Sequence, residues 1–299
     1  MLRVSHLSKS YGDLKAVDDL SFEVKDGVIF GLLGVNGAGK TTTFRMIVGL
    51  LKPDNGEVLL DDKIIDYTMT SSIGFLTEER SLFTKMTVEE QVYFFARLKG
   101  MKKKEIDEEL DKWLDLLDIR EYKHKRIKEL SKGNQQKIQF ICALIHHPKL
   151  LLLDEPFTGL DPFNVAVLMD ILRNLAKEGT MIIFSSHRME HVEVFCDSLL
   201  ILVEGKSIIS GTLKSIKDNY KKKKILLKGN VSLKELKMIN GIEKIERVNQ
   251  EYVIEVSSAK VVKEVFKIVK KSNSLEKFMV EDASLNDIFV SKVGEIKHE

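Results

Sequence analysis

The stretch that decides the fold lies near the start of the chain and reads Gly34-Val35-Asn36-Gly37-Ala38-Gly39-Lys40-Thr41. A glycine, four variable residues, then glycine, lysine and a hydroxyl residue match a phosphate-binding loop at every fixed position. An apolar run at residues 28–33 precedes the loop and an apolar-periodic segment follows it. The loop therefore joins a buried strand to a helix, which is the context that this motif requires. The stretch predicts a site for ATP or GTP.

The residue types of this loop fit the chemistry of phosphate binding. Glycines let backbone N–H groups face one concave space, and the helix that follows adds the positive end of its dipole. We expect Lys40 to reach the β- and γ-phosphates and the Thr41 hydroxyl to ligate Mg²⁺. The contacts are expected to extend through Thr42. A glycine-rich turn that binds nothing is the plain alternative, and the complete match in context disfavours it.

A second candidate group follows the apolar run Leu150-Leu151-Leu152-Leu153 and consists of Asp154 and Glu155. A carboxylate at the end of a buried strand beside the phosphate loop is placed to contact Mg²⁺, and Asp154 is the candidate for that role. Glu155 emerges where the strand ends, where it could polarise the water that attacks the γ-phosphate. Alone, this pattern is as often an ordinary strand end, but the phosphate loop makes it a strong signal.

Further motifs follow in an order that points to one family. Residues 130–137 read Leu-Ser-Lys-Gly-Asn-Gln-Gln-Lys and resemble the signature sequence of ATP-binding cassette (ABC) proteins. Gly159-Leu160-Asp161 is similar to the D-loop of that family, and His187 to its switch histidine. Tyr11 is similar to the aromatic residue that stacks on adenine. Over about residues 1–215 the chain thus resembles the ATP-binding subunit of an ABC transporter.

This resemblance implies a mechanism that one chain cannot complete. In the family, Ser131 and the N–H groups near Gly133 would hold the γ-phosphate of the ATP bound by another subunit. Two nucleotides would then be sandwiched head-to-tail, with Asp161 at the interface and His187 on the γ-phosphate. Because the chain has one phosphate loop and one signature, the resemblance implies a second ATPase subunit, identical or closely related.

Two departures from the family pattern matter. Lys132 and Asn134 replace the usual glycine and glutamine of the signature, although its serine and second glycine remain. Glu78 stands where the family's Q-loop usually carries glutamine, and its oxygen can still serve Mg²⁺ or water. A subgroup of export-type ATPases, which includes sodium-extrusion and drug-export subunits, shares the Glu-Glu-Arg loop at residues 78–80 and a similar C-terminal end at residues 283–289. Export is therefore the expected direction of transport.

The organisation of the chain predicts two domains. Residues 1–215 alternate β-branched runs with amphipathic segments, which predicts an α/β domain with a mixed, largely parallel sheet. A helical insertion is expected at about residues 88–147. After an expected linker at residues 216–224, residues 225–299 show the order β-α-β-β-α-β, which predicts a small ferredoxin-like α+β domain.

Composition and charge exclude other classes of function. The chain has 47 basic and 45 acidic side chains, and the net charge of +2 argues against a dedicated nucleic-acid binder. Cys142 and Cys196 lie far apart, so reduced thiols are expected rather than a metal site. No apolar stretch approaches the ~20 residues needed to span a bilayer. We therefore expect a separate polytopic membrane subunit, with this chain at the cytoplasmic face of the membrane.

Two other classes of function remain to be weighed. One is an ABC ATPase that acts on DNA or the ribosome, but the chain lacks the long coiled coil and the second cassette typical of those proteins. The other is a regulatory module in which the degenerate signature no longer supports hydrolysis. Lys40, Glu155 and His187 are all present, which disfavours it. The nature of the cargo is not encoded in these motifs.

Overall fold

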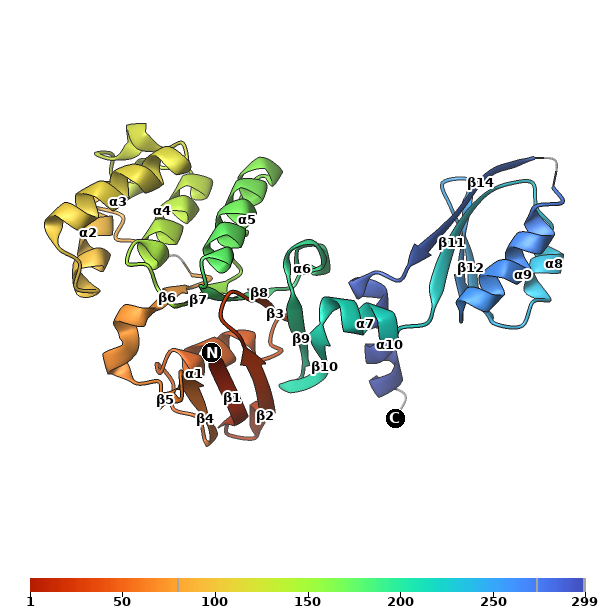
Figure 1. Cartoon of the computed structure of the whole chain (residues 1–299), viewed down its shortest axis with the longest axis horizontal. Coiled ribbons are helices and arrows are strands. Elements are labelled where there is room, and N and C mark those ends of the chain that lie inside the picture. Colours follow the sequence, from red (N-terminus) through yellow and green to blue (C-terminus); the bar gives the residue numbers. More distant parts are fainter. Residues whose placement is uncertain (80, 273, 298–299) are drawn as a thin grey trace. The chain divides into compact units, whose positions relative to one another are not determined.

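The first of two units in the chain, Met1–Gly211, is built on a six-stranded sheet (Figure 1). The computed structural model describes residues 1–79, 81–272 and 274–297. The strands are, in sheet order, β10 (Lys206–Thr212), β9 (Ser198–Val203), β3 (Ile29–Gly34), β8 (Met181–Ser186), β7 (Leu150–Asp154) and β6 (Ile73–Leu76).

This sheet is parallel where its central strands meet. β3 pairs in parallel with β8 and β9, and β7 pairs in parallel with β6 and β8. Every residue of β3, β7 and β8 is buried, as expected for strands covered on both faces. The carboxyl ends of β3 and β7 therefore open at the same edge of the sheet. The predicted α/β class with a largely parallel sheet is confirmed.

A second, antiparallel sheet packs its apolar residues into the same core as the strands of the first sheet. Its order is β2 (Leu14–Val24), β1 (Leu2–Tyr11), β4 (Asn55–Leu60) and β5 (Lys63–Ile64). The longest pairing joins β1 to β2 and ends with Tyr11 opposite Leu14. This hairpin end brings an aromatic side chain to the nucleotide loop described below.

The helices of this unit fall into two groups. Three of them are α1 (Lys40–Ile47), α5 (Pro162–Lys177) and α6 (Met189–Phe195). The other three, α2 (Val88–Leu98), α3 (Lys103–Leu116) and α4 (Lys132–Leu144), form a separate helical region (Figure 1). Thr87 starts α2 through a reciprocal pair of hydrogen bonds with Glu90. Across the described residues, none of the helices has the length and apolar character needed to cross a bilayer.

The second unit, Thr212–Glu299, has its own apolar core. Its elements are α7 (Leu213–Asn219), β11 (Lys223–Gly229), α8 (Leu233–Lys237), β12 (Ile242–Val248), β13 (Glu251–Val256), α9 (Ala259–Val269), β14 (Leu275–Asp282) and α10 (Leu285–Lys297). The antiparallel sheet has the order β12-β13-β11-β14, and α9 buries Val261, Val265 and Val269 in this core. The predicted small α+β domain is confirmed.

The expected linker at residues 216–224 is a point of difference. Helix α7 occupies much of it, and β11 already begins at Lys223. The hydroxyl of Thr212 accepts a hydrogen bond from the backbone N–H of Ser215 and so caps the helix, and Ile216 is buried. The lysine run at residues 221–224 indicates a solvated segment, and for that reason the sequence does not reveal the helix that precedes it.

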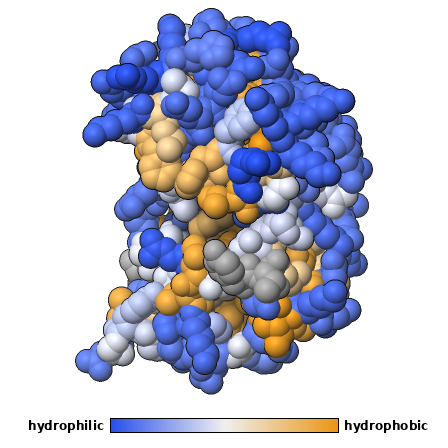
Figure 2. Space-filling model, turned by 90° about the vertical axis from the view of Figure 1, so that its left-hand side faces the viewer, coloured by the Kyte–Doolittle hydropathy of each residue, from blue (hydrophilic) through white to orange (hydrophobic). Residues whose placement is uncertain are grey.

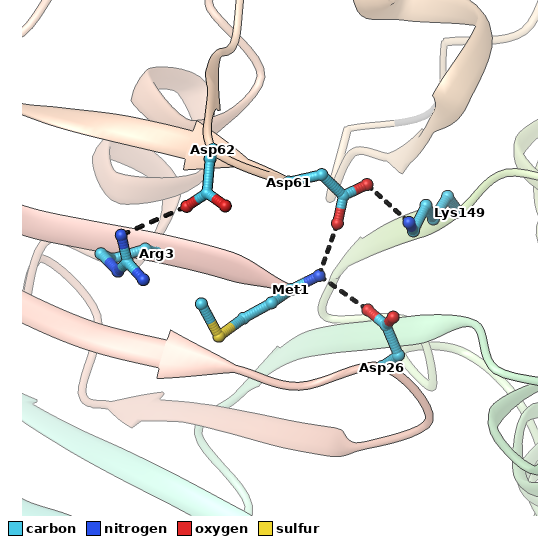
Figure 3. Close-up of polar contacts among 6 residues, drawn as sticks. All are labelled: Met1, Arg3, Asp26, Asp61, Asp62 and Lys149. Atoms are coloured by element: carbon cyan, nitrogen blue, oxygen red, sulfur yellow. Dashed lines mark hydrogen bonds and ion pairs between the residues drawn. The ribbon is translucent and has the colours of Figure 1, made fainter.

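A network of ion pairs links the antiparallel sheet to the start of β7 (Figure 3). The Asp61 carboxylate, in the turn between β4 and β5, lies 2.5 Å from the Lys149 ammonium and 2.7 Å from the Met1 amino group. That amino group also lies 2.7 Å from Asp26. The hydrogen bond from Lys149, followed by that from the Met1 amino group, lowers the pKa of Asp61.

Replacing Asp61 with asparagine is expected to lower stability at pH 7 by about 0.5–1 kcal/mol, or about 1–4 °C in Tm, because solvent screens the half-exposed pair. A carboxylate whose pKa is lowered stabilises the fold above its unfolded pKa and loses that effect as the pH falls. The difference should therefore shrink as the pH falls below the ordinary aspartate pKa of 3.8, as thermal melts at pH 7 and at decreasing pH would show. Asp62→Asn is the control, because Asp62 shares the left-handed backbone but is 80% exposed and lies 3.4 Å from Arg3. Equal effects of the two changes would contradict the expectation.

Candidate functional site

The phosphate-binding loop runs from Gly34, the last residue of β3, to Lys40, the first residue of α1. Gly39 has a φ of 104°, and a Cβ built there would lie 2.3 Å from the carbonyl oxygen of Ala16. Any other residue would strain the backbone and collide with β2. Within the described part of the chain, no side chain caps the start of α1. Its first N–H groups are thus available to an anion.

Lys40 lies at the base of this loop with only 7% of its surface exposed. Its ammonium donates to the carbonyl oxygens of Gly34 at 2.7 Å and Val35 at 3.3 Å. Burial lowers the pKa of Lys40, while three acidic side chains of the site oppose that shift. A triphosphate would give this desolvated cation a charged partner in place of neutral carbonyls.

A cavity of about 380 Å³ opens at the loop. Its lining consists of Tyr11, Leu14, Ala16, Asn36, Gly37, Ala38, Gly39, Lys40, Thr41, Thr42, Glu78, Asp154 and Glu155. The structure thus brings together residues from β1, β2, the loop, α1, the segment after β6 and the end of β7. Tyr11 is half-exposed at the end of β1, where its ring can stack on a base. Gly34 and Val35 contribute their carbonyl oxygens to Lys40 instead of lining the cavity.

Asp154 is fixed at the end of β7 by two hydroxyl groups. The Thr41 hydroxyl donates to its Oδ2 at 2.8 Å, and the buried Ser185 hydroxyl donates to its Oδ1 at 2.5 Å. Ser185 also accepts a hydrogen bond from the backbone N–H of Glu155 at 3.0 Å. One serine of β8 therefore holds both acidic residues in place.

The donor set of Thr41, Asp154 and Glu78 suits Mg²⁺. Mg²⁺ prefers oxygen ligands and is usually bound by one or two carboxylates together with substrate phosphates. Among the described residues, no group of three or more His, Cys, Asp and Glu side chains could hold a metal ion by themselves. The oxygens of this site fit a cation that arrives with a phosphate ligand.

Glu155 and His187 form a pair at the edge of the cavity. The Nδ1 atom of His187 lies 2.9 Å from Oε1 of Glu155. Glu155 is 8% exposed and has a φ of 48°, a left-handed conformation that is uncommon for a residue other than glycine. Such strain at a site persists only where neighbouring contacts enforce it, and Ser185 supplies one such contact.

Ser131 and Gly133 do not line this cavity. Ser131 caps α4 by accepting a hydrogen bond from the backbone N–H of Asn134 at 3.2 Å. A Cβ built on Gly133 would lie 3.7 Å from the carbonyl oxygen of Gly159 and 3.7 Å from Leu160. The signature segment therefore packs against the D-loop and is separated from the cavity of its own chain.

Three residues of the site were not foreseen from the sequence. Leu14 and Ala16 line the cavity, and Ser185 holds the acidic pair. The short turn after Tyr11 was a signal for Leu14, because a tight hairpin places it opposite the tyrosine. For Ser185 the sequence offers no signal, since a serine inside a buried strand has no distinctive spacing.

Comparison with known proteins agrees with this geometry. Residues 17–158 match the family described as ABC transporter, and residues 211–293 match the family described as the C-terminal domain of DrrA1-3-like ATP-binding proteins. The chain is 45% identical over 296 residues to the ABC transporter ATP-binding protein YhaQ of Bacillus subtilis, covering 99% of each chain. The chain belongs to the ABC transporter family of ATP-binding proteins, which hydrolyse ATP to power transport.

Two further relatives extend the comparison. The Nod factor export ATP-binding protein I of Sinorhizobium fredii is 36% identical over 213 residues, which cover 70% of this chain and 62% of that protein. A solved ATP-binding subunit of an ABC transporter has a TM-score of 0.69 and 30% identity, and the match covers 74% of this chain and 93% of that chain. These relatives support the predicted resemblance to ABC ATP-binding subunits.

Proposed function

We propose that this chain is one of two ATPase subunits of an exporter, and that the two close head-to-tail on two ATP molecules beside a separate membrane subunit. The observation that carries this proposal is the position of the signature. The cavity gathers the groups that bind ATP, while Ser131 and Gly133 lie elsewhere on the same chain. A second subunit, identical or closely related, would supply them.

Within each cavity the side chains divide the work of hydrolysis. Lys40 and the N–H groups of the loop bind the β- and γ-phosphates and neutralise their charge. Thr41, Asp154 and Glu78 would hold Mg²⁺, which neutralises charge on the phosphates when bound. Glu155 orients the attacking water and accepts its proton. His187, hydrogen-bonded to Glu155, keeps that carboxylate in place beside the γ-phosphate.

A groove on the helical region supports the proposal that a membrane subunit docks on this chain. It has a volume of about 820 Å³, and its lining consists of Met86, Glu89, Glu90, Tyr93, Phe94, Arg97, Leu98, Lys103 and Asp107. Figure 2 looks onto this side of the molecule and shows a hollowed band of apolar side chains between hydrophilic ones. Phe94 and Leu98 are 40% and 66% exposed. An amphipathic helix of a membrane protein would fit such a groove.

The export direction and the location rest on likeness. A relative named for Nod factor export aligns with most of this chain, and the second unit matches the DrrA1-3-like C-terminal domain. We place the chain at the cytoplasmic face of the membrane, where ATP is available and the groove can reach its partner.

Phe94→Asp tests this proposal, because a charge in the apolar groove opposes docking of an apolar helix. In cells that carry the native membrane partner, the amount of this chain recovered with membranes is expected to fall by about 10-fold or more. Fractionation followed by quantitative blotting measures it. Leu50→Asp is the control, since Leu50 is 70% exposed and lies outside the groove. If Phe94→Asp leaves membrane recovery as high as Leu50→Asp does, the docking role of this groove is wrong.

A further inference from the structure

One buried amide connects α4, the helix that begins at the signature, to the segment that carries Glu78. Gln139 lies on α4 and is 5% exposed. Its Nε2 donates to the carbonyl oxygen of Thr77 at 2.8 Å and to that of Glu79 at 3.3 Å. A third contact reaches the Thr77 hydroxyl at 3.4 Å. One side chain therefore holds the carbonyl groups of the residues before and after Glu78.

Glu78 needs such support, because it lies in a segment without helix or strand after β6 ends at Leu76. Its side chain is exposed and lines the nucleotide cavity. The Thr77 hydroxyl donates to the carbonyl oxygen of Glu79 at 2.7 Å and closes a short turn. Gln139 binds the closed turn from the protein interior, so the direction of Glu78 depends on that amide.

Of the two ends of the Gln139 amide, only the NH₂ group holds the turn. Among the described residues its Oε1 is buried and has no hydrogen-bond partner. A leucine of similar size would fill the same space and remove the unpaired Oε1, but it would also take away the N–H donors to the carbonyl oxygens of Thr77 and Glu79. What glutamine provides at this position, and leucine would not, is therefore the pair of hydrogen bonds to the two carbonyl groups.

The same helix begins at the signature. Ser131 caps α4, and Gln139 follows eight residues later, about 12 Å along the helix axis. A helix moves as a rigid body over that length. If the proposed dimer forms, an ATP that draws Ser131 toward the neighbouring subunit also shifts the turn that carries Glu78.

We propose that Gln139 is a positioning residue: its amide aims Glu78 at the nucleotide cavity and ties that aim to the signature helix. The first part stands on the contacts within one chain, and the link between the two ATP sites rests on the proposed function. Closing of one site would thereby adjust a metal-facing carboxylate in the other.

The test is a double-mutant comparison of Gln139→Leu with Glu78→Ala in the full chain. Gln139→Leu is expected to lower kcat for ATP about 10-fold and to change the Kd for ATP less than about 2-fold, because misplacement affects the reaction more than binding. In a Glu78→Ala background the same change should alter kcat less than about 2-fold, since the group it positions is gone. Equal losses in both backgrounds would overturn the proposal.

A second measurement is independent of turnover. Hydrogen exchange of the backbone at residues 77–79 should speed up in Gln139→Leu, and unchanged exchange there would also overturn the proposal. Gln91→Leu is the matched control, because Gln91 is fully buried on α2 and its Oε1 accepts from the Phe83 backbone N–H at 2.9 Å. It should leave kcat and exchange at residues 77–79 unchanged. A wild-type chain that hydrolyses no ATP, alone or together with its partner subunits, would refute the proposed function, while the exchange result would still decide the role of Gln139.

Discussion

Glu155→Gln is expected to lower the rate of ATP hydrolysis by about 10²–10³-fold while ATP remains bound. The amide keeps the size and much of the hydrogen bonding of the carboxylate, but it cannot accept the proton of the attacking water. The phosphate contacts of Lys40 and the loop are untouched, so the Kd for ATP should change little. Phosphate release in a coupled assay measures the rate.

The same variant should accumulate as an ATP-bound dimer under the proposed mechanism, because hydrolysis no longer separates the subunits. Light scattering after gel filtration with ATP and Mg²⁺ measures the mass. Adding Ser131→Ala to Glu155→Gln is expected to return the chain to a monomer that still binds ATP, since it removes the contact with the neighbouring nucleotide. A dimer that persists without Ser131 would show that the signature does not close the site. Wild-type turnover in Glu155→Gln would remove Glu155 from the role of base.

Lys40→Ala is expected to raise the Kd for ATP by more than about 100-fold, which corresponds to about 3 kcal/mol. The ammonium is the one basic side chain lining the cavity within the described residues, and its loss leaves only the loop N–H groups to offset the nearby carboxylates. Burial lowers the pKa of Lys40, so the folded protein pays to keep this group charged at pH 7.

Titration with a fluorescent ATP analogue measures this affinity, and the chain offers a matched control. Lys99 is also a lysine whose pKa burial lowers, and its ammonium donates to the carbonyl oxygens of Thr70 at 2.5 Å and Ile73 at 3.1 Å. Lys99 lies outside the cavity, so Lys99→Ala should keep the affinity for ATP. If Lys40→Ala binds ATP as tightly as Lys99→Ala does, the phosphate-binding role of the loop is wrong.

Most of the fold and much of the site could be predicted from short stretches of sequence. The phosphate loop is contiguous in sequence, and its glycines are required by the backbone conformation at single positions such as Gly39. Asp154 and Glu155 follow a strand that is buried along its whole length, so the position of their carboxylates follows from sheet topology. The β-α-β-β-α-β order of the second unit was legible because Asn249 and Gln250 mark a tight turn between two strands.

Contacts between distant segments could not be predicted in this way. Ser185 acts through its position opposite Asp154 in a neighbouring strand, and Gln139 reaches a turn about 60 residues earlier in the chain. Polar residues inside a strand or helix have no periodic signature, so their partners emerge only from packing. Helix α7 could not be predicted for a related reason. It is stabilised by the buried Ile216 and the capping hydroxyl of Thr212, whereas the lysine run that follows suggests a solvated linker.

The position of the signature outside the cavity has a consequence for the cell. A solitary copy would load ATP readily, yet under the proposed pairing it lacks the groups that finish the reaction. ATP consumption would then follow the number of paired subunits and rise more steeply than the amount of this polypeptide. A membrane partner that holds two copies side by side would raise ATP consumption without any change in that amount.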